Sequence, residues 1–158
     1  MKIENIELYY LSMPEVLDEA DGSQDALIAK VEGGGLVGWG ECEASPLTSI
    51  ANFVCPKSHS AANPVRDSII NQELNNLEDV KKISRKVKLR SLMIAQTPHT
   101  FSGIEVAILD LLAKKEQCPI YELLGYKKST PKLAYASVLF GNTPEETLKI
   151  AKKMRQKN

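Results

Sequence analysis

Long apolar runs and an excess of charge of either sign are both lacking in this sequence. Apolar runs are short, as at 107–109, whereas roughly 20 apolar residues are needed to cross a bilayer. Twenty Lys and Arg balance twenty Asp and Glu, so no net field attracts the chain to nucleic acid or to an anionic membrane. The first residues alternate charged and apolar side chains, unlike a secretory signal. We therefore expect a cytoplasmic protein with no nucleic-acid and no membrane partner.

A cysteine framework is also lacking. The sequence has three cysteines, Cys42, Cys55 and Cys118, an odd number without CxxC spacing and without a nearby pair of histidines. This pattern argues against a set of disulfides and against a zinc site. We expect the three side chains to be reduced thiols.

The composition is that of a folded globular protein. Of the 158 residues, 43% are hydrophobic and 25% are charged, close to the averages for globular domains. This length allows one full domain and part of a second. Two-residue alternation predicts strands over 2–11, 26–32 and 36–41, and the three glycines between the last two predict a hairpin turn. The three strands should form an antiparallel meander, with loops after the first and third strands leaving from the same end of the sheet.

The part of the sequence from residue 63 to residue 125 has a helical pattern. Asn63 with Pro64 predicts the start of a short helix, and Asn76 predicts the start of a longer one that ends near Arg90. A Ser-x-x-Glu capping box at Ser102 predicts the start of the clearest helix. Its apolar residues recur at helical spacing and are Ile104, Ile108, Leu111 and Leu112. A short helix should follow Pro119 and stop at Gly125.

The last part of the chain predicts one β/α unit. A linker at 127–131 precedes a predicted strand over 132–139, and a capping box that starts at Thr143 predicts a final helix. A single strand of this kind has no neighbour to satisfy its backbone groups. We therefore expect the sequence to be part of a longer protein.

Three segments together resemble one known family. The segment 35–41, Gly-Leu-Val-Gly-Trp-Gly-Glu, is similar to the glycine-rich third strand of the mandelate racemase and muconate-lactonizing branch of the enolase superfamily. The segment 103–114, followed by Pro-x-Tyr-x-Leu-Leu-Gly at 119–125, resembles the long capping-domain helix of that branch. The segments 134–137 and 143–146 resemble its first barrel strand and the start of the helix that follows.

The resemblance implies an α+β fold, in which a three-stranded antiparallel meander is followed by a helical bundle, with the first β/α unit of a truncated TIM-type barrel. Residues 1–127 would be the capping domain and 128–158 the incomplete start of the barrel. It also implies a Mg²⁺-dependent lyase or isomerase that abstracts the α-proton of a small carboxylate substrate, with an acid-sugar dehydratase or racemase favoured. A dipeptide epimerase or a muconate-type cycloisomerase is the alternative enzyme. A stand-alone, non-catalytic binding or oligomerisation module is the alternative of another class.

By the same resemblance, the catalytic lysine and the metal-binding carboxylates would lie beyond Asn158. This chain would then carry no catalytic residue and no metal ligand, would be inactive alone, and would need the remainder of the barrel as its partner. Self-association into a homo-oligomer is also implied.

The resemblance assigns substrate specificity to two capping-domain loops, here 17–24 and 44–52. The candidate specificity residues in these loops are Asp18, Glu19, Asp21, Ser23, Ser45, Thr48 and Ser49. Ser137 is a candidate substrate contact at the barrel mouth, where TIM-barrel active sites lie. The alternative for the carboxylates is simple solvation, and for the hydroxyls it is a turn or capping role.

Two further side chains carry structural predictions. Trp39 is expected to pack beside the helices rather than to stack on a ligand. Asp110 lies on an otherwise apolar helix and therefore predicts a basic or hydrogen-bonding partner. His59 and His99 are expected at the surface.

Overall fold

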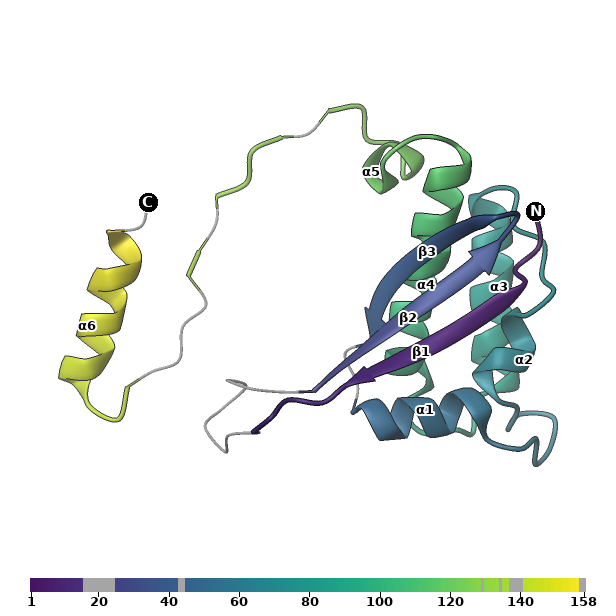
Figure 1. The fold of residues 1–158 in the computed structure, drawn as a ribbon, viewed down its shortest axis with the longest axis horizontal. Helices are drawn as coiled ribbons and strands as arrows, with labels where there is room; N and C mark the ends of the chain where they lie inside the picture. The colour runs from purple at the N-terminus through teal and green to yellow at the C-terminus, as the bar shows by residue number, and fades with distance from the viewer. Residues whose placement is uncertain (16–24, 43–44, 129, 134, 137–140, 157–158) are drawn as a thin grey trace.

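A computed structural model describes residues 1–15, 25–42, 45–128, 130–133, 135–136 and 141–156 of the chain. It contains one sheet in which β1 (Asn5–Leu11), β2 (Ala26–Gly33) and β3 (Leu36–Cys42) follow one another as an antiparallel meander. The predicted meander is confirmed, and Figure 1 shows the three strands side by side.

The hairpin between β2 and β3 is a two-residue turn. Gly33 pairs with Leu36, and the residues between them, Gly34 and Gly35, have φ angles of 56° and 75°. Two-residue turns with positive φ at both positions match the right-handed twist of the strands, and glycine adopts this conformation without steric cost. The predicted hairpin at these glycines is confirmed.

The longest helix covers one face of the sheet, and other helices pack against it. Their bounds are α1 (Pro46–Val54), α2 (Val65–Ile69), α3 (Leu77–Arg90), α4 (Thr97–Lys115), α5 (Ile120–Leu123) and α6 (Pro144–Arg155). Figure 1 shows α4 crossing behind the sheet and α1 below it, whereas α6 stands apart. In the described part of the chain, no helix is long and apolar enough to cross a membrane.

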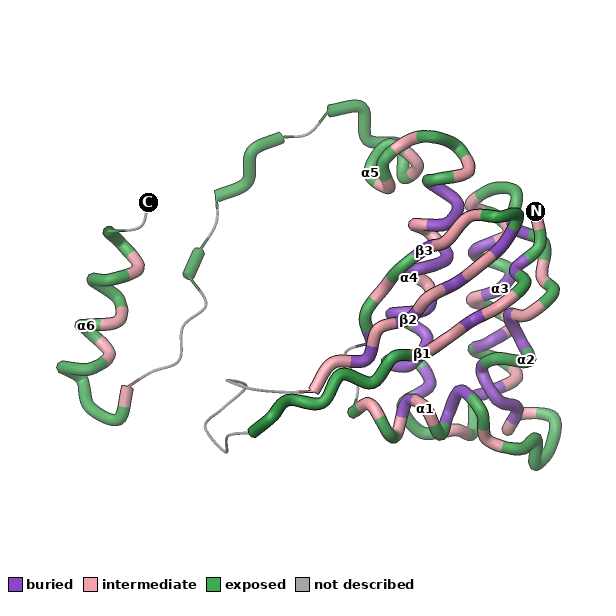
Figure 2. Tube along the Cα trace, in the orientation of Figure 1, coloured by how far each residue is buried: buried purple, intermediate pink, exposed green. Residues whose placement is uncertain are grey.

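The core lies between the sheet and α4. Along β2, the side chains of Leu27, Ala29 and Val31 are fully buried, and they alternate with side chains that point away from the helices. The apolar stripe of α4 packs against them, and its members Ile104, Ile108, Leu111 and Leu112 are all fully buried, as predicted. Figure 2 shows buried residues along β2 and α4, and also on the helices that pack against α4. Each such side chain stabilises the fold by about 1.5–3 kcal/mol relative to an exposed position.

Glycines allow β3 and α4 to touch through their backbones. A Cβ atom on Gly38 or Gly40 would overlap the α4 backbone, and a Cβ atom on Gly103 would overlap the backbone of Glu41 and Cys42. The Gly-x-Gly pattern of β3 and the glycine of α4 are therefore two halves of one contact.

This contact directs Trp39 away from the helices. Because Gly38 and Gly40 face α4, the side chain between them must point to the other side of the sheet. Trp39 is 45% exposed there, and its ring centroid lies 6.0 Å from that of Tyr9. The prediction that Trp39 packs beside the helices is wrong for this reason.

Asp110 has the partners that the sequence predicts. Its Oδ2 accepts hydrogen bonds from the backbone N–H of Trp39 and from Lys114 Nζ, both at 2.8 Å. Lys114 Nζ also donates to the carbonyl oxygen of Val37 at 2.8 Å. Since β3 is an edge strand, these bonds give hydrogen-bond partners to the backbone N–H of Trp39 and the carbonyl oxygen of Val37, which have no neighbouring strand on that side.

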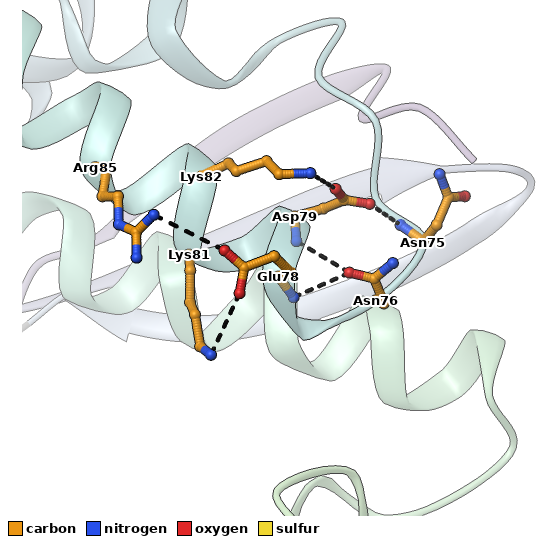
Figure 3. A network of polar contacts seen from close by, with 7 residues as sticks. All are labelled: Asn75, Asn76, Glu78, Asp79, Lys81, Lys82 and Arg85. Carbon is orange, nitrogen blue, oxygen red and sulfur yellow. Dashed lines mark hydrogen bonds and ion pairs between the residues drawn. The ribbon is translucent and has the colours of Figure 1, made fainter.

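The N-terminus of α3 is capped by the residue that the sequence predicts, and the helix ends at Arg90 as expected. Asn76 Oδ1 accepts from the N–H groups of Glu78 at 3.0 Å and Asp79 at 3.2 Å. Asp79 in turn accepts from the Asn75 N–H and forms an ion pair with Lys82, both at 3.0 Å (Figure 3). These contacts satisfy N–H groups at the helix start and place negative charge at the positive end of the helix dipole.

Helix α4 begins five residues before the predicted capping box. Pro98 lies in its first turn, and the preceding residue, Gln96, has a φ of 60°. Proline is well suited to the first turn of a helix, so the chain enters the helix there. Ser102 lies inside the helix, where its hydroxyl donates to the carbonyl oxygen of His99 at 2.7 Å. The predicted start at Ser102 is therefore wrong.

Asn63 does not cap the short helix α2. The side-chain amide nitrogen of Asn63 donates to the carbonyl oxygens of Ser60 at 2.7 Å and Arg90 at 2.9 Å. The N-cap position is instead occupied by Pro64. Asn63 is almost fully buried, and its amide ties the entry of α2 to the end of α3.

The tail contains the predicted helix but not the predicted strand in its described residues. Thr143 caps α6 and accepts from the Glu146 N–H at 3.2 Å. Residues 132–133 and 135–136, however, form no strand, and Leu133 and Tyr135 are 101% and 87% exposed. A strand needs a hydrogen-bonded neighbour, and no described segment pairs with these residues. The rest of 132–139 lies outside the described residues.

The glycine contact predicts a large loss of stability on a small change. Gly40→Ala places a methyl group inside the α4 backbone and should lower the free energy of unfolding by about 3 kcal/mol. Gly35→Ala is the matched control: a Cβ there has open space, so only the positive φ opposes it, at about 1 kcal/mol. Urea denaturation followed by circular dichroism measures both. Equal losses for the two variants would contradict the proposed backbone contact.

Candidate functional site

Three strand ends and a helix start meet at one end of the sheet, which we call the loop end. Leu11, the last residue of β1, pairs with Ala26, the first residue of β2, and Leu27 pairs with Cys42, the last residue of β3. Helix α1 begins close to this end (Figure 1). β1 and β3 therefore end at the same end of the sheet, with β2 between them, as the sequence predicts.

Asp25 connects the two ends of the first of these segments. Its Oδ1 accepts from the Met13 N–H at 2.8 Å, and its Oδ2 accepts from the Tyr10 hydroxyl. Asp25 lies directly before β2, whereas Tyr10 and Met13 lie at and just beyond the end of β1. One carboxylate thus closes the base of the segment 14–24.

These bonds change the acidity of both partners. The hydrogen bond from Tyr10, and next the one from the Met13 N–H, hold the pKa of the Asp25 carboxyl below its usual range, because both donors stabilise the anion. The same bond to Asp25 raises the pKa of the Tyr10 phenol. At neutral pH the pair is a carboxylate and a neutral phenol.

The second predicted loop, 44–52, is a helix from Pro46 onward. Pro46 lies in the first turn of α1, and Ser49, Asn52 and Phe53 are buried along the side that faces the core. Proline at a helix start and three buried positions at helical spacing favour a helix over a loop. The loop prediction is therefore wrong for this part.

A buried polar cluster fastens α1 to the start of α4. Thr100 Oγ1 donates to Ser49 Oγ and accepts from Asn52 Nδ2, both at 3.2 Å, and Asn52 Nδ2 also donates to the carbonyl oxygen of Ala95 at 2.5 Å. The carbonyl oxygen of Thr100 accepts from Cys42 Sγ at 3.3 Å. Thr100, on α4, therefore holds the end of β3 and the body of α1 in one arrangement.

The candidate specificity residues of the second segment differ in accessibility. Ser45 is exposed before the first turn of α1 and makes no capping bond, Thr48 is half-buried, and Ser49 is fully buried in the polar cluster. Because its hydroxyl is already bonded to Thr100, Ser49 positions α1 and does not offer a hydroxyl to the solvent-facing side. The remaining candidates lie outside the described residues: Asp18, Glu19, Asp21, Ser23 and Ser137.

Four residues whose hydrogen bonds brace the loop end were not singled out from the sequence: Tyr10, Asp25, Asn52 and Thr100. An acidic residue directly before a strand was a usable signal for Asp25, because Asp side chains often bond nearby backbone N–H groups. Asn52 and Thr100 gave no local signal, since their partners are 43 to 51 residues away.

The thiol at this end is unreactive. Burial raises the pKa of the Cys42 thiol to about 11, so the neutral form predominates at pH 7. Cys42, Cys55 and Cys118 are all free cysteines in the structure.

Among the described residues, no group of three or more His, Cys, Asp or Glu side chains is arranged to hold a metal ion. The described part of this chain therefore does not fit a Mg²⁺ site. What it does provide is one end of the sheet at which β1 and β3 both end and which hydrogen bonds brace.

A three-stranded antiparallel meander covered on one face by helices defines an α+β domain. Residues 18–125 match the family model of the mandelate racemase / muconate lactonizing enzyme N-terminal domain. The chain belongs to this family, within the enolase superfamily.

Solved structures agree with this assignment. The chain is similar to the crystal structure of a predicted mandelate racemase from Rhodobacter sphaeroides, at 52% sequence identity and a TM-score of 0.94 over 99% of this chain. It also shares its fold with a mandelate racemase/muconate lactonizing enzyme-like protein from Rubrobacter xylanophilus DSM 9941, at 18% identity and a TM-score of 0.62 over 98% of this chain. The chain spans 40% of the first structure and 39% of the second. No curated protein matches it.

The polar cluster at Thr100 predicts that removal of one hydroxyl lowers the stability of the fold. Thr100→Val keeps the shape but leaves Ser49 Oγ without its donor and Asn52 with one acceptor fewer. We expect the free energy of unfolding to fall by about 2 kcal/mol. Ser102→Ala, an exposed hydroxyl two residues along the same helix, should change it by less than about 0.5 kcal/mol. Thermal and urea denaturation measure both, and a neutral Thr100→Val would show that the cluster does not hold α1.

The Asp25 contacts predict a pH-dependent effect. An amide has one acceptor oxygen, so Asp25→Asn can keep only one of the two bonds to Tyr10 and Met13. Because the folded-state pKa of Asp25 lies below its usual value of 3.8, its contribution is fully present above that pH and is lost as the pH falls through the folded pKa.

The difference in melting temperature between wild type and Asp25→Asn should therefore be constant above about pH 5 and shrink below about pH 4. Amide hydrogen exchange at Met13 should be faster in the variant at pH 7. A difference that persists unchanged at low pH would show that the carboxylate charge is not involved.

Proposed function

We propose that this chain is the capping part of a Mg²⁺-dependent enzyme that abstracts the α-proton of a small carboxylate substrate, and that the enzyme is an acid-sugar dehydratase or racemase. Family membership supports the general class. The observation that carries the role of this chain is the loop end, where the segments after β1 and β3 leave together from a braced base. Two such segments can cover a reaction centre and exclude water from it.

In this proposal the segment 17–24 and the part 44–48 of the second segment, 44–52, contact the substrate, and the rest of the loop end holds them. The first segment offers Asp18, Glu19, Asp21 and Ser23, and the second offers Ser45 and Thr48. Hydroxyl and carboxylate groups suit a polyhydroxylated acid better than an apolar one, because they can accept and donate hydrogen bonds to its hydroxyls. Ser137 is the proposed contact from the barrel side.

The metal, the catalytic base and the remaining barrel belong to parts of the protein that this chain does not include. Bound Mg²⁺ would stabilise the negative charge that develops on the substrate carboxylate when its α-proton leaves. In this proposal the residues of this chain bind, orient and shield the substrate, and the proton transfer belongs to the barrel.

A dipeptide epimerase or a muconate-type cycloisomerase is the alternative within the superfamily, and it would require more apolar segments. A stand-alone binding module is the alternative of another class. Reading the gene past codon 158 distinguishes the enzyme from the stand-alone module. A continuing reading frame with Lys-x-Lys and then spaced acidic residues supports the enzyme. A stop codon there supports the module.

The activity can be tested on the protein that the complete gene encodes. In ²H₂O with Mg²⁺, a panel of acid sugars, dipeptides and muconate-type acids is followed by proton NMR for loss of the α-proton signal. We expect Mg²⁺-dependent exchange or dehydration with at least one acid sugar, and none with the 158-residue chain alone. Turnover restricted to dipeptides or muconates would favour the alternative enzymes, and turnover by this chain alone would overturn the assignment of catalysis to the barrel.

A further inference from the structure

The buried polar cluster at the loop end fastens one helix to another where solvent does not reach. Ser49 and Asn52 on α1 and Thr100 on α4 are at most 6% exposed. Thr100 Oγ1 is hydrogen-bonded to both of the others, at 3.2 Å each. Hydrogen bonds are electrostatically stronger inside a protein than in water, and a buried polar group without a partner is costly. The cluster therefore restrains α1 strongly.

Asn52 is held at both of its amide hydrogens. Its Nδ2 atom donates to the carbonyl oxygen of Ala95 at 2.5 Å and to Thr100 Oγ1 at 3.2 Å. An amide nitrogen has two hydrogens, so both are used, and the side chain cannot turn without losing a bond. Both acceptors belong to the start of α4, because Ala95 lies two residues before the helix and Thr100 lies in its first turn.

A short helix needs such contacts to fix its orientation. Helix α1 has nine residues, and helices of this length are marginal alone, so its orientation depends on the rest of the fold. The apolar contact of Phe53 with the core is non-directional and allows α1 to turn about its own axis. Hydrogen bonds weaken steeply with angle, so those of Ser49 and Asn52 set this rotation.

Thr48 lies on the side of α1 that these bonds fix. It precedes Asn52 by four residues, so the two side chains are neighbours on the helix surface. Thr48 is half-buried, and its β-branched side chain has few rotamers, so its hydroxyl follows the helix closely. A turn of α1 by about 20° would displace an oxygen about 4 Å from the helix axis by about 1.4 Å. A displacement of that size is enough to break a hydrogen bond.

We propose that Thr100 and Asn52 are positioning residues for substrate binding, because they hold α1 at the rotation at which Thr48 bonds a hydroxyl group of the substrate. Both positioning residues are buried and act through α1 without touching the substrate. The inference rests on the proposed function, in which Thr48 contacts the substrate, and it adds the residues on which that contact depends. Ser45 lies before α1 and Ser49 is bonded inside the cluster, so Thr48 is the hydroxyl that the cluster places.

The test uses the protein that the complete gene encodes and the acid that the substrate panel identifies. Thr100→Val keeps the shape but removes the hydroxyl, and it should raise KM about tenfold, the equivalent of one hydrogen bond, while kcat changes by less than about threefold. Thr100→Ser keeps the hydroxyl and should hold KM within about threefold of wild type. Ser102→Ala removes a hydroxyl from the same helix outside the cluster and should leave KM unchanged.

A double-mutant cycle shows whether Thr100 acts through Thr48. Thr48→Val alone should raise KM about tenfold, and adding Thr100→Val should raise it no further, because the contact that Thr100 places is already lost. Effects that multiply in the double variant would mean that Thr100 acts by another route. An unchanged KM in Thr48→Val would mean that this hydroxyl does not meet the substrate, and either result overturns the proposal. A Thr100→Val enzyme that loses kcat in proportion to its folded fraction, with KM unchanged, would have lost only stability.

Amide hydrogen exchange on the same intact protein tests the hold on α1 without turnover. Thr100→Val should speed exchange at the α1 amides about tenfold or more relative to those of α4, and Thr100→Ser should not. Unchanged exchange together with turnover would overturn the positioning role alone. Faster exchange without turnover of any carboxylate would overturn the proposed function, and with it the role of the cluster in substrate binding.

Discussion

The direct contact between the backbones of β3 and α4 is the constraint on which the rest of this domain depends. Gly38 and Gly40 on the strand and Gly103 on the helix leave no room for a Cβ atom between them. Because the two backbones meet without intervening side chains, α4 cannot shift along β3 without a clash. The sheet, the longest helix and the core between them therefore have one fixed relative position.

The candidate site follows from that fixed position. Thr100 precedes Gly103 by one turn of α4, so the glycine contact brings it to the end of β3, where its carbonyl oxygen accepts from Cys42. Its hydroxyl then holds α1 through Ser49 and Asn52. The polar cluster at the loop end is thus continuous with the core of the domain.

The same contact also decides what the two faces of the sheet can do. Glycines on the helix side require the large side chain of Trp39 to lie on the face turned away from α4, beside Tyr9 and the ion pairs of Lys30. One face builds the core, one end carries the projecting segments, and the other face presents an aromatic and acidic surface. In the proposed enzyme the first two regions serve folding and substrate selection, respectively.

Local pattern alone determined a large part of this fold. Strand alternation, the glycine hairpin, the Asn76 cap and the apolar stripe of α4 all depend on neighbours within a few residues, and each was predictable for that reason. The partner of Asp110 was predictable in kind, because a carboxylate on an apolar helix needs one, although its identity was not. The family motifs extended these inferences to the order of the elements.

The tertiary structure decided the features whose causes lie far apart in the sequence. Whether 44–52 is a loop or a helix depends on burial against α4, and whether Trp39 points inward depends on how closely α4 approaches β3. The predicted strand over 132–139 needed a hydrogen-bonded partner, which no described segment provides. Sequence thus determined elements held by local bonds, and only the folded chain decided those held by contacts between residues tens of positions apart, because such contacts leave no periodic trace in the sequence.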